Sequence, residues 1–416
     1  MSAPARKRLW MLLLWCVATL TATAQTDGDI RTVTLYLNGA EMERPFVRLG
    51  STDRLQLSFD QLGSQPDAFR YRIRHCDANG DVDDLQPYDF IEGFDEGNID
   101  DYRPSFGTRQ AYIHYTATLP APYSRLTASG NYVVQILTEE NDSVVAEHPF
   151  CVYEELFDIE LAVGRPSTTQ GDIFRDQDLS VALTGRNHFS VANLTHFLRV
   201  VVQQNKRRDL CRDLQFSGYD GGRMMFRWQE ASLFPGGNDF RFVDISNLNS
   251  IAYNIVKVDH FGDETFVMLR PEEDKSKRVY TSSPSLNGGM KVNVWDRNDP
   301  PTEADYVWVN FSLPLASPFL DRSVHLVGEL TDWRLDDGSR MEWRPEYRTY
   351  TLRLLLKQGY YAYQLLTLRP GEKQASTADL EGDHFETPND YTVFVYLHQP
   401  GDRYDRLVAT KTLLGR

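Results

Sequence analysis

The clearest indication of the fold is the segment Ser129-Gly130-Asn131-Tyr132-Val133-Val134-Gln135-Ile136-Leu137, in which a turn leads into alternating polar and apolar residues. Alternation with a period of two predicts a β-strand with one buried face. A turn followed by tyrosine is typical of a late strand in an immunoglobulin-like sandwich. The next run, residues 144–153, continues the pattern and would place Phe150 and Val152 in the core of that sandwich.

Short alternating runs also come before this segment. They are separated by turn signals such as Asn38-Gly39 and Asp77-Ala78-Asn79-Gly80. About seven short strands within roughly 125 residues predict one immunoglobulin-like sandwich. The earlier predicted strands are residues 31–37, 55–60, 69–75 and 112–119.

The rest of the chain repeats this organisation. Alternation restarts at Phe157 and again at Tyr306, and the segment Arg297-Asn298-Asp299-Pro300-Pro301 between them predicts a stiff linker. A chain of 416 residues is also too long for a single core. We therefore predict an all-β protein of three consecutive immunoglobulin-like or related β-sandwich domains, at residues 25–155, 156–303 and 304–416, after a signal peptide at residues 1–24.

The N-terminus predicts export. Arg6-Lys7-Arg8 precedes an apolar run at residues 9–17, and Ala22-Thr23-Ala24 supplies the small residues that a signal peptidase requires. The apolar run is too short for a membrane span. The bulky residue before Cys16 does not fit a lipobox, so we expect a mature chain that begins at Gln25 and carries no lipid.

The charge and the cysteines exclude several functions. Removing residues 1–24 takes away 3 of the 44 basic residues and none of the 59 acidic ones, so the mature net charge is 41 − 59 = −18. Such a surface repels nucleic acid and anionic lipid. Cys76, Cys151 and Cys211 then remain, without metal-ligand or redox spacing. Cys76 and Cys151 could form a disulfide or remain buried free thiols, and the sequence leaves both possibilities open.

One stretch departs from the alternation: Tyr-Asp-Phe-Ile-Glu-Gly-Phe-Asp-Glu-Gly-Asn-Ile-Asp-Asp-Tyr-Arg-Pro-Ser-Phe-Gly-Thr-Arg-Gln-Ala-Tyr-Ile-His-Tyr at residues 88–115. It is acidic and aromatic, and glycine and proline interrupt any regular element. Aromatic side chains in an irregular loop usually rest on a partner or cap the end of a sheet. We predict a partner-binding site formed by Tyr88, Phe90, Phe94, Asp95 and Tyr102.

This stretch resembles the signature of the type IX secretion system plug protein family of Bacteroidota. In that family a similar Tyr-Asp/Phe-Ile-x-Gly-Phe-x-Glu segment is followed by Asp-Tyr-x-x-Ser and by a Tyr-x-His-Tyr strand, which here are residues 101–105 and 112–115. The resemblance implies a non-enzymatic periplasmic protein that binds the large outer-membrane β-barrel translocon and sterically plugs its periplasmic opening when no cargo is present. We expect a monomer that reaches the membrane only through the barrel, and a rigid rod of sandwiches would suit this role.

A further resemblance supplies an alternative function. Residues 324–333 and 359–365 are similar to two strands of the immunoglobulin-like glycogen-binding modules, which would imply a carbohydrate-binding accessory protein of the cell envelope. Sugar binding requires exposed aromatic side chains. The candidates are Trp333, Trp343 and Tyr363, although the same residues would serve equally well in a core.

Catalytic and metal-binding patterns are weak. Asp95 and Asp101 would suit a glycosidase only if they faced each other across a sugar-sized cleft. Asp81-Val82-Asp83-Asp84, followed by Asp89, is rich in oxygen ligands but lacks EF-hand spacing. We expect no enzymatic activity, no metal and no cofactor.

Overall fold

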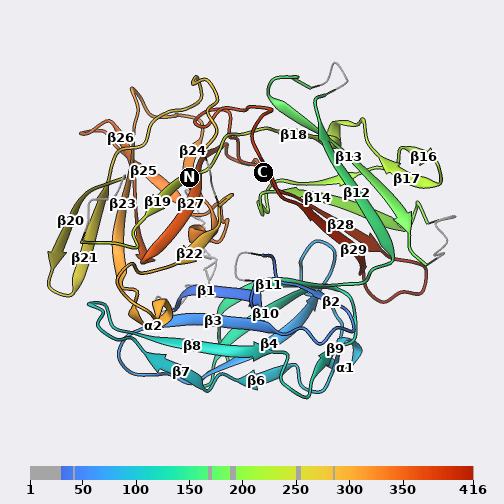
Figure 1. Cartoon of the computed structure of the whole chain (residues 1–416), viewed down its shortest axis with the longest axis horizontal. Coiled ribbons are helices and arrows are strands. Elements are labelled where there is room, and N and C mark those ends of the chain that lie inside the picture. Colours follow the sequence, from blue (N-terminus) through green and yellow to red (C-terminus); the bar gives the residue numbers. More distant parts are fainter. Residues whose placement is uncertain are drawn as a thin grey trace, which may run out of the picture.

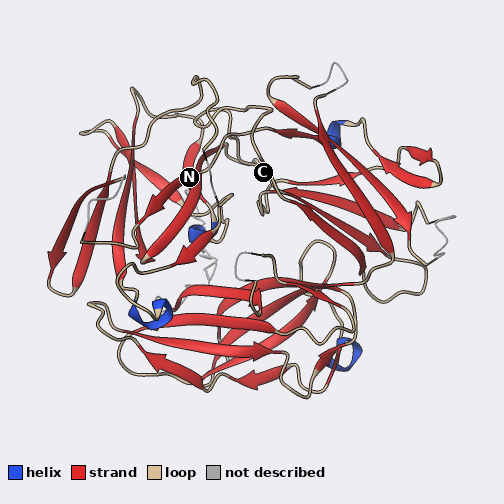
Figure 2. Ribbon diagram, in the orientation of Figure 1, coloured by secondary structure: helices blue, strands red, loops and turns tan. Residues whose placement is uncertain are grey.

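The computed structural model describes residues 30–40, 43–166, 171–187, 194–249, 254–283 and 286–415. The predicted signal peptide, with Cys16, lies outside these ranges. Figure 2 shows that the described chain consists of β-strands joined by loops, with a few one-turn helices. None of the helices in these ranges has the length and apolar character of a membrane span. The prediction of an all-β protein built from sandwiches is confirmed.

Unit 1 is a sandwich of two antiparallel-rich sheets with the strand orders β1-β3-β8-β7 and β2-β11-β10-β4-β6. Phe59, Phe150 and Val152 are buried in the core between the sheets, as expected for Phe150 and Val152. The Tyr132 hydroxyl donates a hydrogen bond of 2.8 Å to the Ala128 carbonyl, which is the corner arrangement of immunoglobulin-like folds. The elements are β1 (Ile30–Leu37), β2 (Phe46–Arg48), β3 (Leu55–Leu62), β4 (Phe69–Cys76), α1 (Pro87–Phe90), β5 (Ile91–Glu92), β6 (Glu96–Asn98), β7 (Asp101–Pro104), β8 (Tyr112–Leu119), β9 (Arg125–Leu126), β10 (Gly130–Thr138) and β11 (Val144–Tyr153).

Unit 2 is another sandwich, with the sheet orders β12-β13-β17-β16 and β15-β14-β28-β29. Its core combines residues far apart in the chain, such as Leu179, Val200, Val393 and Val408. The elements are β12 (Phe157–Gly164), β13 (Asp176–Gly185), β14 (Leu198–Gln204), β15 (Cys211–Leu214), β16 (Gly218–Asp220), β17 (Arg223–Phe226), η1 (Glu230–Ser232), β18 (Leu233–Pro235), β28 (Tyr391–Leu397) and β29 (Arg406–Leu413).

Unit 3 is one nine-stranded sheet that folds over its own core, with the order β19-β27-β24-β25-β26-β23-β21-β20 and β22 paired to β27. β25 pairs with β24 through Met341 and with β26 through Trp343, so it turns the corner between the two halves. The elements are β19 (Arg241–Asp244), β20 (Ile255–Phe261), β21 (Glu264–Leu269), β22 (Met290–Val292), α2 (Pro300–Glu303), β23 (Tyr306–Pro314), β24 (Ser323–Val327), η2 (Glu329–Thr331), β25 (Arg340–Arg344), β26 (Thr349–Lys357) and β27 (Gly359–Leu368).

Units 2 and 3 are interleaved in the sequence, which differs from the predicted consecutive ranges 156–303 and 304–416. The last two strands return to unit 2, where β28 pairs with β14 from Leu198↔Leu397 to Gln204↔Tyr391. Conversely, β19 pairs with β27 through Arg241↔Tyr363 and belongs to unit 3. In Figure 1 the dark red strands β28 and β29 accordingly lie among the green strands of unit 2. Local alternation predicts a strand but not its partner, so the exchange was invisible in the sequence.

The predicted linker at residues 297–301 does not join units 2 and 3 as an extended crossing. It lies within unit 3 and leads into α2, whose prolines occupy the first helical turn. The Phe106 amide donates a hydrogen bond of 2.9 Å to the Thr302 carbonyl, and the Tyr112 hydroxyl donates one of 2.8 Å to the Ala304 carbonyl. This segment therefore fastens unit 3 to unit 1.

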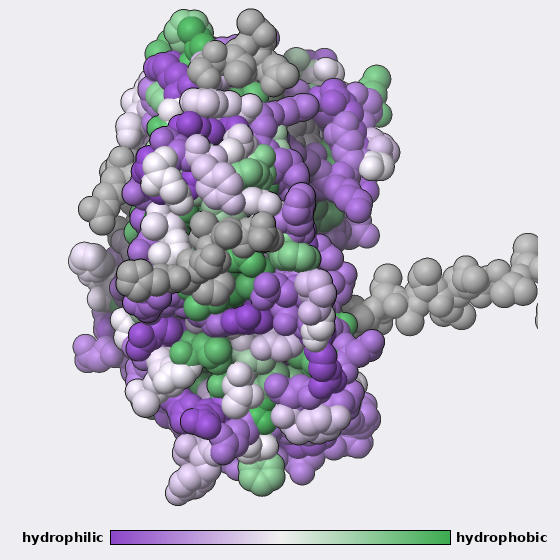
Figure 3. Space-filling view, turned by 90° about the vertical axis from the view of Figure 1, so that its right-hand side faces the viewer, coloured by the Kyte–Doolittle hydropathy of each residue, from purple (hydrophilic) through white to green (hydrophobic). Residues whose placement is uncertain are grey.

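The three units form a closed triangle and not a rod. Figure 1 shows unit 1 below, unit 3 on the left and unit 2 on the right, each beside the other two. Figure 3 views the right-hand side, which is mostly hydrophilic with scattered hydrophobic patches.

Candidate partner-binding surface

Residues 88–115 supply an end strand to each of the two sheets of unit 1. β6 pairs with β4 at the end of the five-stranded sheet, and β7 pairs with β8 at the end of the four-stranded sheet. α1 and β5 precede them and cover the end of the sandwich near β9. The stretch thus crosses from one sheet to the other, which explains why it breaks the simple alternation.

Part of this stretch is scaffold. Phe90 is fully buried and packs in the core of unit 1 with Ile91 and Ile99. The prediction that Phe90 contacts a partner is therefore wrong, because its ring already fills the end of the sandwich. Gly97 lies against the Tyr71 ring, and a Cβ atom there would come within 2.7 Å of the Tyr71 hydroxyl. Any larger residue would have to displace that buried ring.

The acidic residues of the stretch mostly have partners within the chain. Glu96 forms ion pairs with Arg70, at 3.0 Å, and with Arg72. The Thr116 hydroxyl donates a hydrogen bond of 2.7 Å to Asp101. Asp95 is half-buried just before β6, whereas Asp101 begins β7 in the other sheet. The two carboxylates are thus held by different sheets.

The carboxylates of the segment near residue 81 and of Asp89 also have partners within the chain. Asp83 lies 2.5 Å from His75 Nδ1, and Asp89 forms an ion pair of 2.5 Å with Arg403. Within the described residues, no group of three or more His, Cys, Asp or Glu side chains could hold a metal ion.

The remaining aromatic side chains of the predicted site point outward. Tyr88 is 79% exposed, Phe94 73% and Tyr102 47%, and the Tyr102 ring leans on Tyr115 with 5.5 Å between centroids. The Phe94 amide donates a hydrogen bond of 2.8 Å to the Ser124 hydroxyl, so the backbone at this position is fixed while the ring remains in solvent.

Sequence reasoning missed two further exposed rings. Tyr123 is 97% exposed and directly precedes Ser124, which holds the Phe94 backbone. Phe106 is 71% exposed and lies beside α2. A shallow hollow adjoins Tyr88 and is lined by Gln86, Pro87, Ile91, Glu92, Gly93 and Thr127. We call Tyr88, Phe94 and Tyr123, with this hollow, the aromatic end of unit 1.

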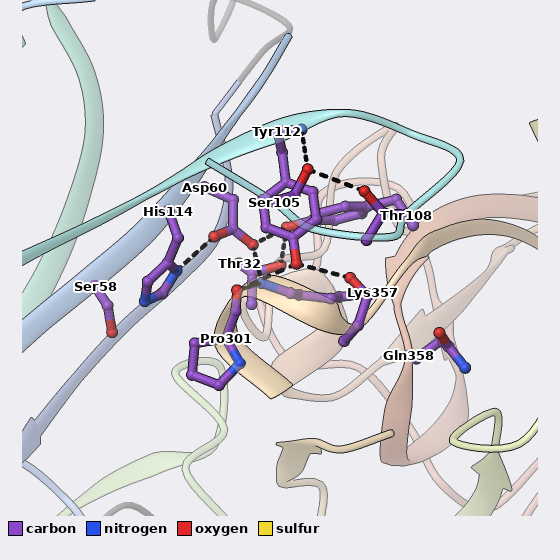
Figure 4. Close-up of polar contacts among 12 residues, drawn as sticks. Thr32, Ser58, Asp60, Ser105, Thr108, Tyr112, His114, Pro301, Lys357 and Gln358 are labelled. Atoms are coloured by element: carbon purple, nitrogen blue, oxygen red, sulfur yellow. Dashed lines mark hydrogen bonds and ion pairs between the residues drawn. The ribbon is translucent and has the colours of Figure 1, made fainter. Parts of the chain in front are cut away.

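The contact between units 1 and 3 is built on buried charge (Figure 4). The Lys357 ammonium donates hydrogen bonds of 2.6 Å to the Asp60 carboxylate and to the Pro301 carbonyl. Asp60 also accepts a hydrogen bond of 2.6 Å from the Tyr306 hydroxyl and lies 2.7 Å from His114 Nδ1. We call Asp60, His114, Tyr306 and Lys357 the junction cluster.

The environment of Lys357 makes the ion pair necessary. Both charged side chains are 1% exposed, and the ammonium lies 4.2 Å from the centre of the Tyr112 ring. Burial lowers the pKa of Lys357, while Asp60 opposes this shift. Removing Lys357 would leave the Asp60 carboxylate buried with only Tyr306 and His114 as partners, and removing Asp60 would leave the ammonium buried without a counter-ion, which is strongly unfavourable. The junction cluster therefore fixes unit 1 against unit 3.

The sequence marked only His114 of this cluster, as part of the Tyr-x-His-Tyr segment, and gave no sign of Asp60 or Lys357. Asp60 lies on the face of β3 opposite to Leu57 and Phe59, where alternation predicts a solvated residue. Lys357 follows the apolar run 354–356 at the end of β26. Both become buried only because another unit covers that face.

Unit 1 meets unit 2 through apolar and polar contacts. The Phe46 and Phe394 rings pack edge to face with 5.8 Å between centroids. The Tyr396 hydroxyl donates a hydrogen bond of 2.9 Å to Asn131, and Arg406 forms an ion pair of 2.7 Å with Glu154.

The three cysteines of the described ranges are not paired with one another. Cys76 and Cys151 lie on the two strands that flank Asn131, in the same row across the sheet, with β10 between them. They and Cys211 are free thiols, so the open question about a disulfide is answered in favour of thiols.

Units 2 and 3 complete the triangle. The Arg207 guanidinium is buried, forms an ion pair of 2.5 Å with Asp209 and donates a hydrogen bond of 2.6 Å to the Ala375 carbonyl. Lys206 also forms an ion pair of 3.4 Å with Glu329 of η2. Each unit is thus bonded to both others.

The residues that suggested sugar binding do not form an exposed platform. Tyr363 is fully buried, Trp333 is buried beside Phe240, and Trp343 packs against Tyr350 with 5.0 Å between ring centroids. Their pattern is explained by the core of unit 3.

Fold and site together define a multi-unit β-sandwich protein with exposed aromatic residues at the edge of its first unit. Residues 30–154 match the family model described as type 9 secretion system plug protein 1st domain. A crystal structure of a hypothetical protein from Parabacteroides merdae matches with 30% identity and a TM-score of 0.89, covering 93% of this chain and 97% of that one. The chain belongs to the type IX secretion system plug protein family and is a component of that system.

Other comparisons add nothing to this assignment. A mutant α-2-macroglobulin from Salmonella has 13% identity and a TM-score of 0.20, covering 92% of this chain and 26% of that one. An alkylpurine DNA glycosylase from Pseudomonas fluorescens has 14% identity and a TM-score of 0.17, covering 30% of each chain. These values are too low to carry a structural argument. No curated protein matches the sequence.

Proposed function

We propose that this protein is a non-enzymatic periplasmic plug, which binds the outer-membrane barrel translocon of the type IX secretion system and closes its periplasmic opening when no cargo occupies it. The observation that carries the proposal is family membership, through the match at residues 30–154 and the nearly full-length similarity to the Parabacteroides structure.

The architecture supports a steric mechanism. A wide opening is closed by a body that keeps its shape, and three units that are each bonded to the other two cannot swing as a chain of separate domains would. The buried ion pair between Asp60 and Lys357 adds a geometric constraint at the contact between units 1 and 3.

The aromatic end of unit 1 is the proposed contact surface. Binding energy concentrates in a few large aromatic side chains that become buried on association. Tyr88 and Phe94 are exposed on a backbone held by α1 and by Ser124, so little ordering is lost when a partner covers them. Asp95 at the rim adjusts the rate and salt dependence of association.

Co-purification tests the proposal. The tagged mature protein, incubated with detergent-solubilised outer membranes of its source bacterium, is expected to retain the translocon barrel. Retention of other outer-membrane proteins without the barrel would contradict the proposal.

A further inference from the structure

A strand at the periphery of unit 3 has an outer edge with which no other strand of the described residues pairs. β20 is the last strand of the nine-stranded sheet and has seven residues. Figure 1 shows the β20–β21 hairpin at the outer edge of the molecule. An edge strand presents main-chain N–H and C=O groups that another strand can bind.

The hairpin turn defines which groups of β20 point outward. Phe261 pairs with Glu264 across a two-residue turn that begins at Gly262, whose φ is +60°. In such a hairpin the flanking pair exchanges hydrogen bonds, and alternate residues do so along the ladder. Lys257, Asp259 and Phe261 therefore bond to β21, and the amides of Val258 and His260 face outward.

The other sheet ends are less suitable. The end strand β7 contains Pro104, which lacks a main-chain donor. The end strand β1 is contacted by unit 3, where the Tyr306 hydroxyl lies 2.6 Å from Thr32. The end strands β12 and β29 contact each other, because the Lys411 side chain of β29 donates a hydrogen bond to the Ile159 carbonyl of β12. The remaining end strands of the five larger sheets in the described chain have three or four residues, namely β2, β6, β15, β16 and β19.

Exposed apolar side chains accompany the open edge. Phe261 is 65% exposed and packs against Phe266 of β21 with 5.8 Å between ring centroids. Met268 is 51% exposed, and the pairing of Phe266 with Trp308 continues the aromatic row onto β23. A strand added beside β20 could extend this row with its own apolar side chains.

The open edge lies at the opposite end of unit 1 from the aromatic end, next to residues 105–110. The Arg109 guanidinium donates a hydrogen bond of 3.3 Å to the Gly262 carbonyl, so residues 105–110 of unit 1 touch the β20–β21 turn. Phe106, in that segment, is 71% exposed. Residues 88–115 therefore run across unit 1 from the aromatic end to the edge of β20, and both ends lie on the periphery of the molecule, where a body that closes an opening meets the wall of that opening.

We propose that an extended segment of the translocon adds to β20 as a further strand. It would exchange main-chain hydrogen bonds with Val258 and His260 and place an apolar side chain beside Phe261, as in recognition by strand addition. The segment would be free of proline at the paired positions and apolar at alternate ones. This inference rests on the proposed function, because it names the same partner.

Hydrogen exchange resolved to single amides tests the inference directly. In the free protein the amides of Val258 and His260 should exchange rapidly, whereas those of Asp259 and Phe261 should be protected by the hairpin. Addition of the purified barrel should slow exchange at Val258 and His260 at least ~10-fold. A barrel complex in which these two amides exchange as in the free protein would overturn strand addition.

A proline variant provides an independent test. His260→Pro removes an outward main-chain donor and keeps the main-chain bonds to β21, although the side-chain hydrogen bond of 3.0 Å between His260 and Thr265 is lost. Tyr219→Pro is the matched control for the main-chain change, because Tyr219 holds the corresponding position in the β16–β17 hairpin. We expect His260→Pro to weaken barrel binding about 10-fold and Tyr219→Pro to leave it unchanged. Equal binding by both folded variants would refute strand addition and leave the proposed function intact. If the unaltered protein does not bind the barrel, both proposals fail. Should His260→Pro not fold, Phe261→Glu and the exchange experiment decide.

Discussion

Two regions rich in aromatic and charged residues can be compared, namely residues 88–115 at the edges of the sheets of unit 1 and the junction cluster, where one sheet face of unit 1 meets unit 3. Residues 88–115 are conspicuous in the sequence, yet they include scaffold residues such as Phe90, Ile99 and Gly97. In the junction cluster only His114 belongs to that signature, whereas Asp60 and Lys357, which form the fully buried ion pair between units, lie in no distinctive sequence pattern. A sequence signature can thus report how a domain edge is built, whereas the ion pair that joins two units leaves no local pattern.

The two regions also differ in whether their side chains are free to contact a partner. Asp60 and Lys357 are already paired with each other and with neighbouring polar groups. Tyr88 and Phe94 rise from a fixed backbone into solvent. The junction cluster should therefore govern stability, and the exposed aromatic residues should govern binding.

The largest effect is expected from Lys357→Met. Loss of the cation leaves the Asp60 carboxylate buried without its ammonium partner, which should lower the free energy of unfolding by about 3–5 kcal/mol. Denaturant unfolding measures this. Asp60→Asn combined with Lys357→Met should be less destabilising than Lys357→Met alone, because no unpaired charge remains. A loss below about 1 kcal/mol in the single variant would show that the pair does not hold the junction.

A pair of phenylalanine variants sharpens the distinction within residues 88–115. Phe90→Ala removes a buried ring and should cost about 3–4 kcal/mol of stability. Phe94→Ala removes an exposed ring and should change stability by less than about 0.5 kcal/mol. Melting temperatures of the two variants, compared with the unaltered protein, check this. Equal destabilisation by both would mean that Phe94 folds back onto the sandwich.

Gly97→Ala tests whether the signature glycine is structural. Its new methyl group meets the Tyr71 ring, and overpacking of this kind typically costs about 1–3 kcal/mol. Gly164→Ala is the control, because its methyl group would meet no atom closer than 3.9 Å. Calorimetry of both variants should show a lowered melting temperature for Gly97→Ala alone.

The smallest effect is expected from Asp95→Asn. A rim carboxylate mainly alters the association rate, so the affinity for the barrel should fall by less than about 1 kcal/mol and the salt dependence should become weaker. Binding kinetics at two ionic strengths measure this. A severe loss of affinity with unchanged salt dependence would instead place Asp95 inside the contact.

Much of the secondary structure could be predicted from the sequence, because each strand has one buried face. The turn before Tyr132 and the alternation at residues 144–153 predicted strands of a sandwich with Phe150 and Val152 in its core, and both features are present. The pairing of β14 with β28 could not be predicted, since nearly 200 residues separate them and alternation does not name a partner.

The candidate site was only partly predictable for a similar reason. Tyr88, Phe94 and Tyr102 are exposed as the acidic, aromatic composition suggested, but no local feature separates Phe90 from them. Tyr123 lies outside the signature and joins the surface through Ser124. Lysine side chains are usually exposed to solvent, and Lys357 is buried only because unit 3 packs on unit 1.

Closure of the translocon is tested most directly by the ion conductance of the purified barrel in a planar bilayer, recorded before and after addition of this protein to the periplasmic side. We expect the open-channel current to fall sharply with the unaltered protein, and Phe94→Ala to require at least ~10-fold more protein for the same closure. A current unchanged at protein concentrations that saturate binding would contradict the claim that this protein closes the opening.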